Sequence, residues 1–98
     1  MIYDADKRMN ELEEGIIQLL NERLIPEAGI LSGLGHHIYK DVADKLTKFE
    51  NDLKDDTFTA RRLILTKNGP VTIEDWTKHT REWLNQFKTK YIKNSRFL

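Results

Sequence analysis

The chain has 98 residues and a mass of 11.6 kDa, which is the size of one domain and too short for two. Hydrophobic residues make up 39% and charged residues 33%, a mixture that suits a small helical protein with a small interior and a large hydrated surface. The chain contains no cysteine, which excludes disulfide scaffolds, zinc–thiolate sites and thiol nucleophiles. No apolar run approaches the roughly 18 residues of a membrane span, and the charges of Asp4, Asp6, Lys7 and Arg8 argue against a signal peptide. We therefore expect a cytoplasmic protein that makes no membrane contact.

The formal net charge of zero hides opposite charges in the two parts of the chain. Residues 1–56 carry thirteen Asp and Glu against seven Lys and Arg, and residues 57–98 carry three against nine, so their net charges are −6 and +6. Such a split marks an interaction surface in some proteins. In others the acidic and basic parts attract each other within one fold, and the sequence leaves both interpretations open.

The first predicted helix covers residues 4–25. Its apolar residues recur at steps of three and four and form one face: Met9, Leu12, Ile16, Leu20 and Leu24. We interpret Gly15, within this segment, as a surface glycine rather than as a sign of a close helix crossing. Pro26 ends the helix, and residues 26–36, which include three glycines, form the connection that follows.

The same periodicity predicts the second and the last helices. The second covers residues 37–55, and its apolar face is formed by Ile38, Val42, Leu46, Phe49 and Leu53. The last begins at Thr72, whose hydroxyl is placed to cap the helix, with Asp75 three residues on. Its face carries large aromatic side chains and consists of Ile73, Trp76, Thr80, Trp83, Phe87 and Tyr91. We expect Trp83, at the centre of this face, to be largely buried, so that Trp83→Ala costs about 3–5 kcal/mol.

The segment from residue 57 to residue 67 fits two structures. Asp55, Asp56 and Thr57 offer caps for a short helix, which Asn68-Gly69-Pro70 would end. The same segment fits a hairpin, because residues 63–66 resemble a strand and Asn68-Gly69 favours a tight turn. We favour the helix, because a return strand of residues 71–73 is too short for useful pairing.

These elements predict an all-α fold in a single domain of residues 1–98. We expect a small antiparallel bundle of about four helices, with the third helix short or replaced by the hairpin. The expected core consists of Leu12, Ile16, Leu20, Ile38, Leu46, Phe49, Leu53, Trp76, Trp83 and Phe87.

No group of residues has the spacing of a known catalytic or metal site. His36 and His37 with Asp41 are poorly arranged for chelation, because adjacent histidines point about 100° apart on a helix, and we interpret them as a polar helix start. The glycines of residues 29–35 lack the Lys-Ser/Thr of a phosphate-binding loop, and neither Ser32 nor Ser95 has a His–acid framework. We expect no enzyme activity, no metal and no cofactor.

We expect a small non-catalytic protein–protein interaction module, such as an adaptor, inhibitor or assembly subunit, that acts through charge-segregated helical faces or by self-association. The sequence does not distinguish this role from that of a subunit in a larger bacterial or viral assembly. The alternative is a nucleic-acid-binding or transcription-regulating protein, in which the aromatic face stacks on bases and the basic part attracts phosphate. The candidate residues for either surface are Arg61, Arg62, Lys78, Arg81, Lys88, Lys90 and Lys93.

Overall fold

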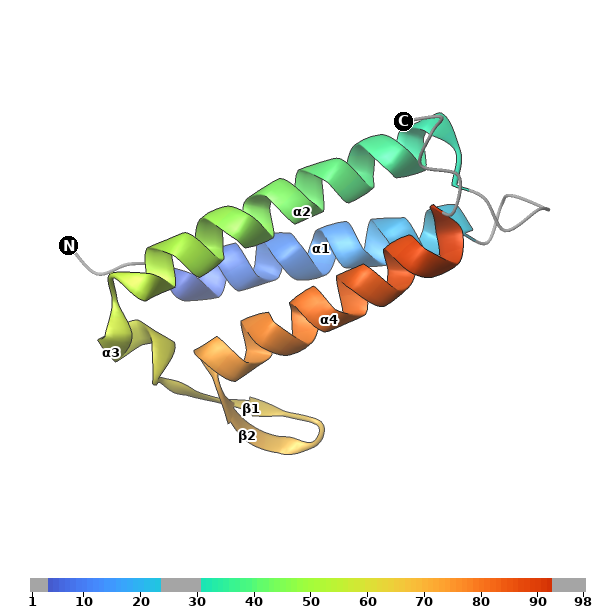
Figure 1. Cartoon of the computed structure of the whole chain (residues 1–98). Helices are drawn as coiled ribbons and strands as arrows, with labels where there is room; N and C mark the ends of the chain where they lie inside the picture. Colours follow the sequence, from blue (N-terminus) through green and yellow to red (C-terminus); the bar gives the residue numbers. More distant parts are fainter. Residues whose placement is uncertain (1–3, 24–30, 93–98) are drawn as a thin grey trace.

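The computed structural model describes residues 4–23 and 31–92, and in these ranges the chain forms four helices and one two-stranded hairpin (Figure 1). The elements in chain order are α1 (Ala5–Arg23), α2 (Gly33–Lys54), α3 (Thr57–Ala60), β1 (Leu63–Thr66), β2 (Gly69–Thr72) and α4 (Ile73–Tyr91). Helices account for 78% of the described residues, so the expectation of a mostly helical chain is confirmed. Residues 26–30 of the predicted connection 26–36, together with Leu24 and Lys93, lie outside the described residues.

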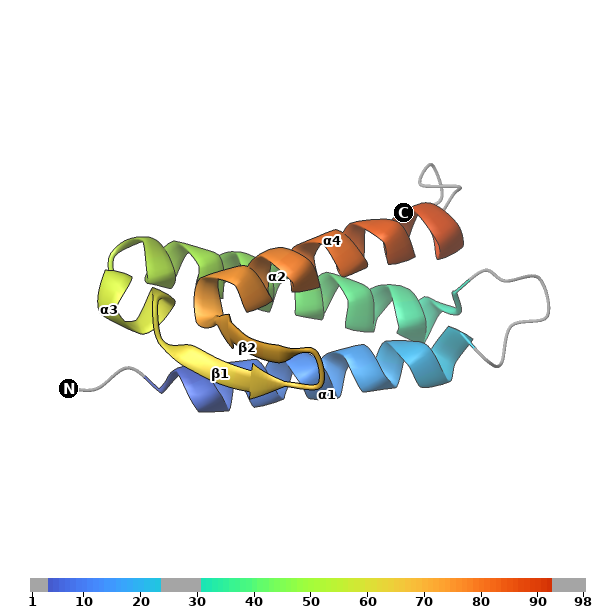
Figure 2. The same cartoon turned by 90° about the horizontal axis from the view of Figure 1, so that it is seen from below.

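Three long helices lie side by side, and α2 runs in the direction opposite to α1 and α4 (Figures 1 and 2). Both α1 and α4 pack against α2, and α3 connects α2 to the hairpin at the end of the molecule where α4 begins. The hairpin lies below the helices in Figure 1, with β2 in contact with α4. No helix of the described ranges is both long enough and apolar enough to cross a membrane.

The second helix begins four residues before the predicted start, because Ser32 caps it. The Ser32 hydroxyl accepts a hydrogen bond from Gly35 N–H at 3.1 Å, and its carbonyl accepts one from His36 N–H at 3.0 Å. Ser32 also hydrogen-bonds to Glu22 near the end of α1, which ties the start of α2 to its neighbour. The predicted cap of α4 is confirmed, because Thr72 Oγ1 accepts a hydrogen bond from Asp75 N–H at 3.1 Å.

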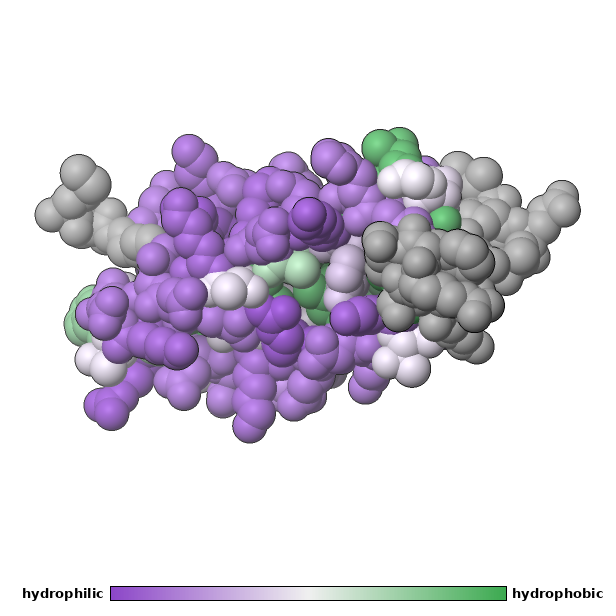
Figure 3. All heavy atoms as spheres, turned by 45° about the horizontal axis from the view of Figure 1, so that its top comes forward, coloured by the Kyte–Doolittle hydropathy of each residue, from purple (hydrophilic) through white to green (hydrophobic). Residues whose placement is uncertain are grey.

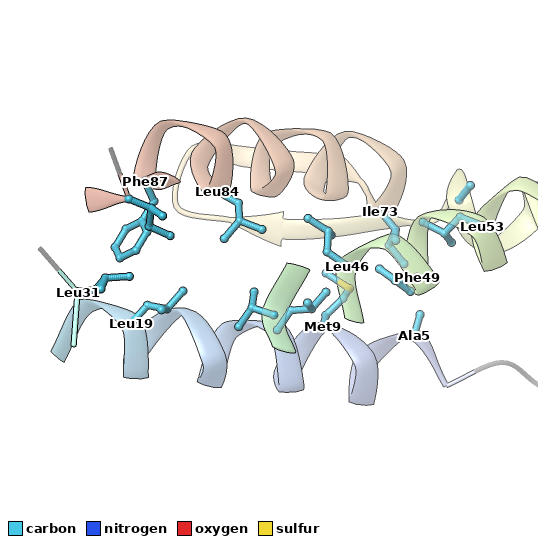
Figure 4. Packing of buried hydrophobic residues seen from close by; sticks show 14 residues of the cluster. Ala5, Met9, Leu19, Leu31, Leu46, Phe49, Leu53, Ile73, Leu84 and Phe87 are labelled. Atoms are coloured by element: carbon cyan, nitrogen blue, oxygen red, sulfur yellow. The ribbon is translucent and has the colours of Figure 1, made fainter. Parts of the chain in front are cut away.

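The core is a single apolar cluster between the three long helices (Figure 4). Its most enclosed side chains are Leu12, Leu19, Val42, Leu46, Phe49, Ile73 and Leu84. Among the residues expected in the core, five are buried: Leu12, Leu46, Phe49, Leu53 and Phe87. The other five are partly buried: Ile16, Leu20, Ile38, Trp76 and Trp83.

The buried face of α4 is rotated relative to the face predicted from its aromatic residues. It consists of Ile73, Thr77, Thr80, Leu84 and Phe87, at steps of four, three, four and three. The hydroxyls of Thr77 and Thr80 donate to the carbonyls of Glu74 and Trp76, so both side chains enter the core with their polar groups satisfied. Trp83 is therefore only partly buried, contrary to expectation, and stacks on Phe87 with the ring centroids 5.2 Å apart.

The segment after α3 is a hairpin, so the longer helix that we favoured for residues 57–67 is wrong. The helix ends at Ala60, and the strands pair antiparallel from Leu63↔Thr72 to Thr66↔Gly69. The return strand begins at Gly69 rather than at Val71, which gives it four residues instead of three. Gly69 adopts a φ of +107°, a backbone conformation that side chains other than glycine rarely occupy, and it allows the sharp reversal.

Gly15 marks the close crossing of α1 and α2 that we did not favour from the sequence. A Cβ atom at this position would lie 2.4 Å from Val42 Cγ2, well inside van der Waals contact. The absence of a side chain therefore sets the separation of the two helices at this point.

We expect Gly15→Ala to destabilise the protein. Alanine favours helix by about 1 kcal/mol, but the clash with Val42 is of the kind that costs about 1–3 kcal/mol in a packed interior. Urea unfolding measures the difference. Gly33→Ala is the matched control, because a Cβ at Gly33 meets nothing within 4 Å and the variant is expected to be at least as stable as the native chain. A Gly15→Ala protein more stable than the native one would contradict the close crossing.

Candidate interaction surface

The basic residues expected to form one binding surface are divided between two ends of the molecule. Arg61 and Arg62 follow α3, whereas Lys88 and Lys90 lie in the last turn of α4, at the opposite end in Figure 1. Lys78 lies between these ends on the exposed side of α4, and Lys93 is outside the described residues. The structure therefore does not bring the seven residues together.

Two of these basic residues are engaged with the acidic part of the chain. Arg62 Nη2 lies 2.5 Å from Asp6 Oδ1 at the start of α1. Arg81 forms a two-pronged contact with Glu50 on α2, through Nη2 at 2.6 Å and Nε at 3.3 Å, and Nη2 also donates to Thr47 Oγ1 at 2.9 Å. The opposite charges of the two parts of the chain thus attract each other within the fold, which was one of the two interpretations of the sequence.

Among the described residues, three of the five strongly exposed large apolar side chains lie on α3 and β1, and the other two, Ile17 and Leu34, lie on α1 and α2. Phe58 is 86% exposed, Leu65 85% and Leu63 65%, and these three lie within eight residues of one another. Phe58 lines an open hollow of about 420 Å³ together with Thr57, Arg61 and Arg62. We define the hairpin surface as Phe58, Arg61, Leu63, Leu65, Lys67 and Pro70.

The exposure of the two leucines follows from the alternation of side chains along a strand. Ile64 and Thr66 point toward the helices and are partly buried, and Ile64 packs against the core. Leu63 and Leu65 therefore point to the outer face, where Leu65 pairs with the exposed Pro70 of β2. The apolar outer face of this hairpin therefore packs against no other element among the described residues.

Hydrogen bonds at both ends hold this surface in place. Asp56 caps α3, because its carboxylate accepts from Thr59 N–H at 3.0 Å and from Thr59 Oγ1–H at 2.6 Å. These bonds favour the charged form and lower the pKa of Asp56. At the other end, Ile73 N–H donates to Arg62 C=O at 3.0 Å and joins the hairpin to the start of α4.

Two further hollows have linings that do not point to a particular kind of partner. One of about 410 Å³ lies between α2, α3 and α4, where Leu53, Ala60 and Thr77 are surrounded by side chains of both charges. The other, of about 250 Å³, lies beside the aromatic rings of Trp83, Phe87 and Tyr91. Figure 3 shows that the face seen from above is mostly hydrophilic, with hydrophobic atoms in a narrow central hollow and in small groups near the two ends.

The residues considered for chemistry do not assemble into a site. Within the described ranges, no three His, Asp or Glu side chains lie close enough to hold a metal ion. His36 and His37 are the fourth and fifth residues of α2, and Asp41 forms an ion pair with Lys45 at 3.1 Å.

Sequence reasoning missed Phe58, Leu63 and Leu65 as functional candidates. A signal was present, because Arg61, Leu63, Leu65 and Lys67 alternate with the period of a strand. The preference for a helix over this segment concealed it, since a helix distributes these four side chains around its axis.

Comparison of the chain with protein-family models, with curated proteins and with solved structures found no match.

We expect the contribution of Asp56 to stability to disappear in acid. Because its pKa is lowered in the fold, the charged group stabilises the native state above the ordinary range of an aspartate, and this contribution is lost as pH falls through the lowered pKa. Urea unfolding of the native chain and of Asp56→Asn between pH 7 and pH 2.5 measures it. The difference between the two proteins should shrink steadily toward low pH.

The matched control is Asp55→Asn, which removes the neighbouring exposed carboxylate, a group that is not bonded to Thr59. A difference between the native protein and Asp56→Asn that stays constant over the whole range would contradict the capping role of the carboxylate.

Proposed function

We propose that the chain is a small non-catalytic protein-interaction module that binds another protein through the hairpin surface. The observation that carries this proposal is the strong exposure of three large apolar side chains, Phe58, Leu63 and Leu65, on two successive elements of the chain, α3 and β1. Single exposed apolar residues are ordinary, but exposed apolar groups with a polar rim are characteristic of interaction sites. Arg61 and Lys67 supply such a rim.

The helices serve as the scaffold in this proposal. We infer that α1, α2 and α4 form an antiparallel bundle whose core fixes the start of α4, and through it the hairpin. The function expected from the sequence is thus retained, but its surface moves from the charged helical faces to α3 and the hairpin. A cytoplasmic location belongs to the same proposal, since a chain without cysteine needs no oxidising compartment.

The distribution of basic residues favours a protein partner over a nucleic acid. A phosphate-binding surface needs several free cations along one track. Arg62 and Arg81 are paired with carboxylates, and Lys88 and Lys90 lie at the end opposite the hairpin.

We expect substitution of the exposed apolar residues to remove binding without affecting folding. Phe58→Ser and Leu65→Ser should each change the free energy of unfolding by no more than about 0.5 kcal/mol, because neither side chain is packed. Thermal and urea unfolding test this part. A photoreactive phenylalanine analogue at position 65 should cross-link a defined protein in the cells that naturally produce the chain.

The matched control carries the same photoreactive residue at Lys48, an exposed position in the middle of α2. Cross-links from position 65 that are absent from position 48, and that disappear in the Phe58→Ser background, support the proposal. Equal cross-linking from both positions, or none from position 65, contradicts it.

We expect nucleic-acid binding to be weak. At about 150 mM salt, fluorescence anisotropy with labelled duplex and single-stranded oligonucleotides should give dissociation constants no tighter than about 1 μM, the range of non-specific contacts. A submicromolar constant that rises steeply with salt, and that weakens when Arg61 and Lys78 are both changed to Glu, would replace the proposed protein partner with a nucleic acid.

A further inference from the structure

The backbone of β1 presents unpaired hydrogen-bonding groups on the edge that faces away from β2. In an antiparallel pair, positions that exchange hydrogen bonds alternate with positions that do not. Ile73 N–H donates to Arg62 C=O, so the pairs that contain Leu63 and Leu65 are the ones without mutual hydrogen bonds. The N–H and C=O groups of both leucines therefore point outward, and no group of the described residues bonds to them.

The edge of β2 does not offer the same groups. Pro70 has no N–H, and Thr72 is the N-cap of α4, a position at which the backbone carbonyl faces the first turn of the helix. The two edges therefore differ, and β1 carries the edge that is able to pair. It lies on the side of the hairpin away from α4, beyond the strand that contacts this helix (Figure 2).

The side chains along this edge define what kind of strand fits it. Leu63 and Leu65 stand on the outer face and are largely exposed. Arg61 and Lys67 are also exposed and lie just beyond the two ends of β1, Arg61 as the C-cap of α3 and Lys67 in the turn. A strand added antiparallel to β1 would place two alternate residues opposite the leucines, and its two ends would lie near the two cations. Apolar side chains suit the positions opposite the leucines, because directly opposed side chains interact across a sheet. Carboxylates suit the ends of the added strand, because they carry the charge opposite to that of the cations.

We propose that β1 accepts an extended segment of a partner protein as a third, antiparallel strand, and that this segment carries two alternate apolar residues flanked at alternate positions by acidic residues. This inference rests on the proposed function and specifies how the partner is bound. The backbone groups of Leu63 and Leu65 supply up to four hydrogen bonds, and the side chains of Arg61, Leu63, Leu65 and Lys67 select the sequence.

The test uses synthetic peptides and the full chain. The peptide Glu-Thr-Val-Thr-Val-Thr-Glu, blocked at both ends, has the required pattern, and Lys-Thr-Val-Thr-Val-Thr-Lys is its charge-reversed control. Amide hydrogen exchange followed by NMR reports each backbone N–H separately. Saturating acidic peptide should slow exchange at Leu63 and Leu65 by at least about tenfold, while the basic peptide should bind at least about tenfold more weakly.

N-methylated peptides separate backbone pairing from simple apolar contact. Methyl groups on the two valine amides, which would point at β1, should abolish the protection. Methyl groups on the first two threonine amides, which would point away, should leave it largely intact. Leu65→Pro provides the corresponding test in the protein, because it removes an N–H that the hairpin does not use. This variant should remain folded by circular dichroism and bind the peptide more weakly than Leu65→Ser does.

Each alternative occupant gives a distinct result. Protection of Leu63 and Leu65 in the chain alone at high concentration, together with a doubled mass in solution, would show that a second copy occupies the edge and would overturn the proposal. Peptide binding that tolerates methylation of the valine amides would overturn strand addition in favour of apolar contact. If no peptide protects these amides while position 65 still cross-links a partner, strand addition is wrong and the proposed function stands. If peptide protection and cross-linking are both absent, strand addition and the proposed function are both wrong.

Discussion

The position of the hairpin, and of every exposed group on it, depends on Ile73. This residue opens α4, where a helix leaves its first N–H groups without partners inside the helix. Its N–H donates to the carbonyl of Arg62, just before β1, while its side chain is completely enclosed in the core. One residue thus joins the strand register, the start of the last helix and the packing of the three long helices. A shift of the hairpin by one residue would lose this bond and would also turn Leu63 and Leu65 inward.

Charge acts in this protein mainly to hold its own parts together. The acidic first part and the basic second part meet in two ion pairs, Asp6 on α1 with Arg62 and Glu50 on α2 with Arg81. Exposed ion pairs of this kind contribute little stability individually. The contact of Arg81 is more specific, because its guanidinium bonds to both oxygens of Glu50 and to Thr47, and about a third of each charged side chain remains exposed. The remaining free cations near the hairpin, Arg61 and Lys67, then border an apolar surface rather than forming a basic track.

A two-stranded hairpin is marginal when isolated, so the scaffold matters for the proposed role. Here Ile64 is packed against the core, the Asp56 cap fixes α3, and Thr66 Oγ1 donates to Gly69 C=O at 2.7 Å to brace the turn. The edge of β1 is consequently held in an extended conformation before any partner arrives. Pre-ordering of this kind lowers the entropic cost of pairing with a flexible segment. Natural proteins usually protect such edges with proline or charge, and this hairpin has proline only on β2.

The amino-acid sequence by itself determined the local features of the fold. The spacing of Leu46, Phe49 and Leu53 specifies a helix and its buried face, and the hydroxyl of Thr72 followed by Asp75 specifies where the last helix begins, because both signals act within one or two turns of the chain. The charge split was also visible in the sequence, although its internal role was one of two open interpretations.

Only the tertiary structure decided the features that depend on distant partners. Gly15 became a close crossing because Val42 of another helix lies against it, and Thr77 and Leu84 are buried in α4 where Trp76 and Trp83 were expected. The choice between helix and hairpin after Ala60 was decided in the same way. Residues 61–67 satisfy either local pattern, and the bond from Ile73 to Arg62 with the burial of Ile64 exists only in the hairpin. Contacts made across the fold, and not local preference, therefore left Leu63 and Leu65 on the surface.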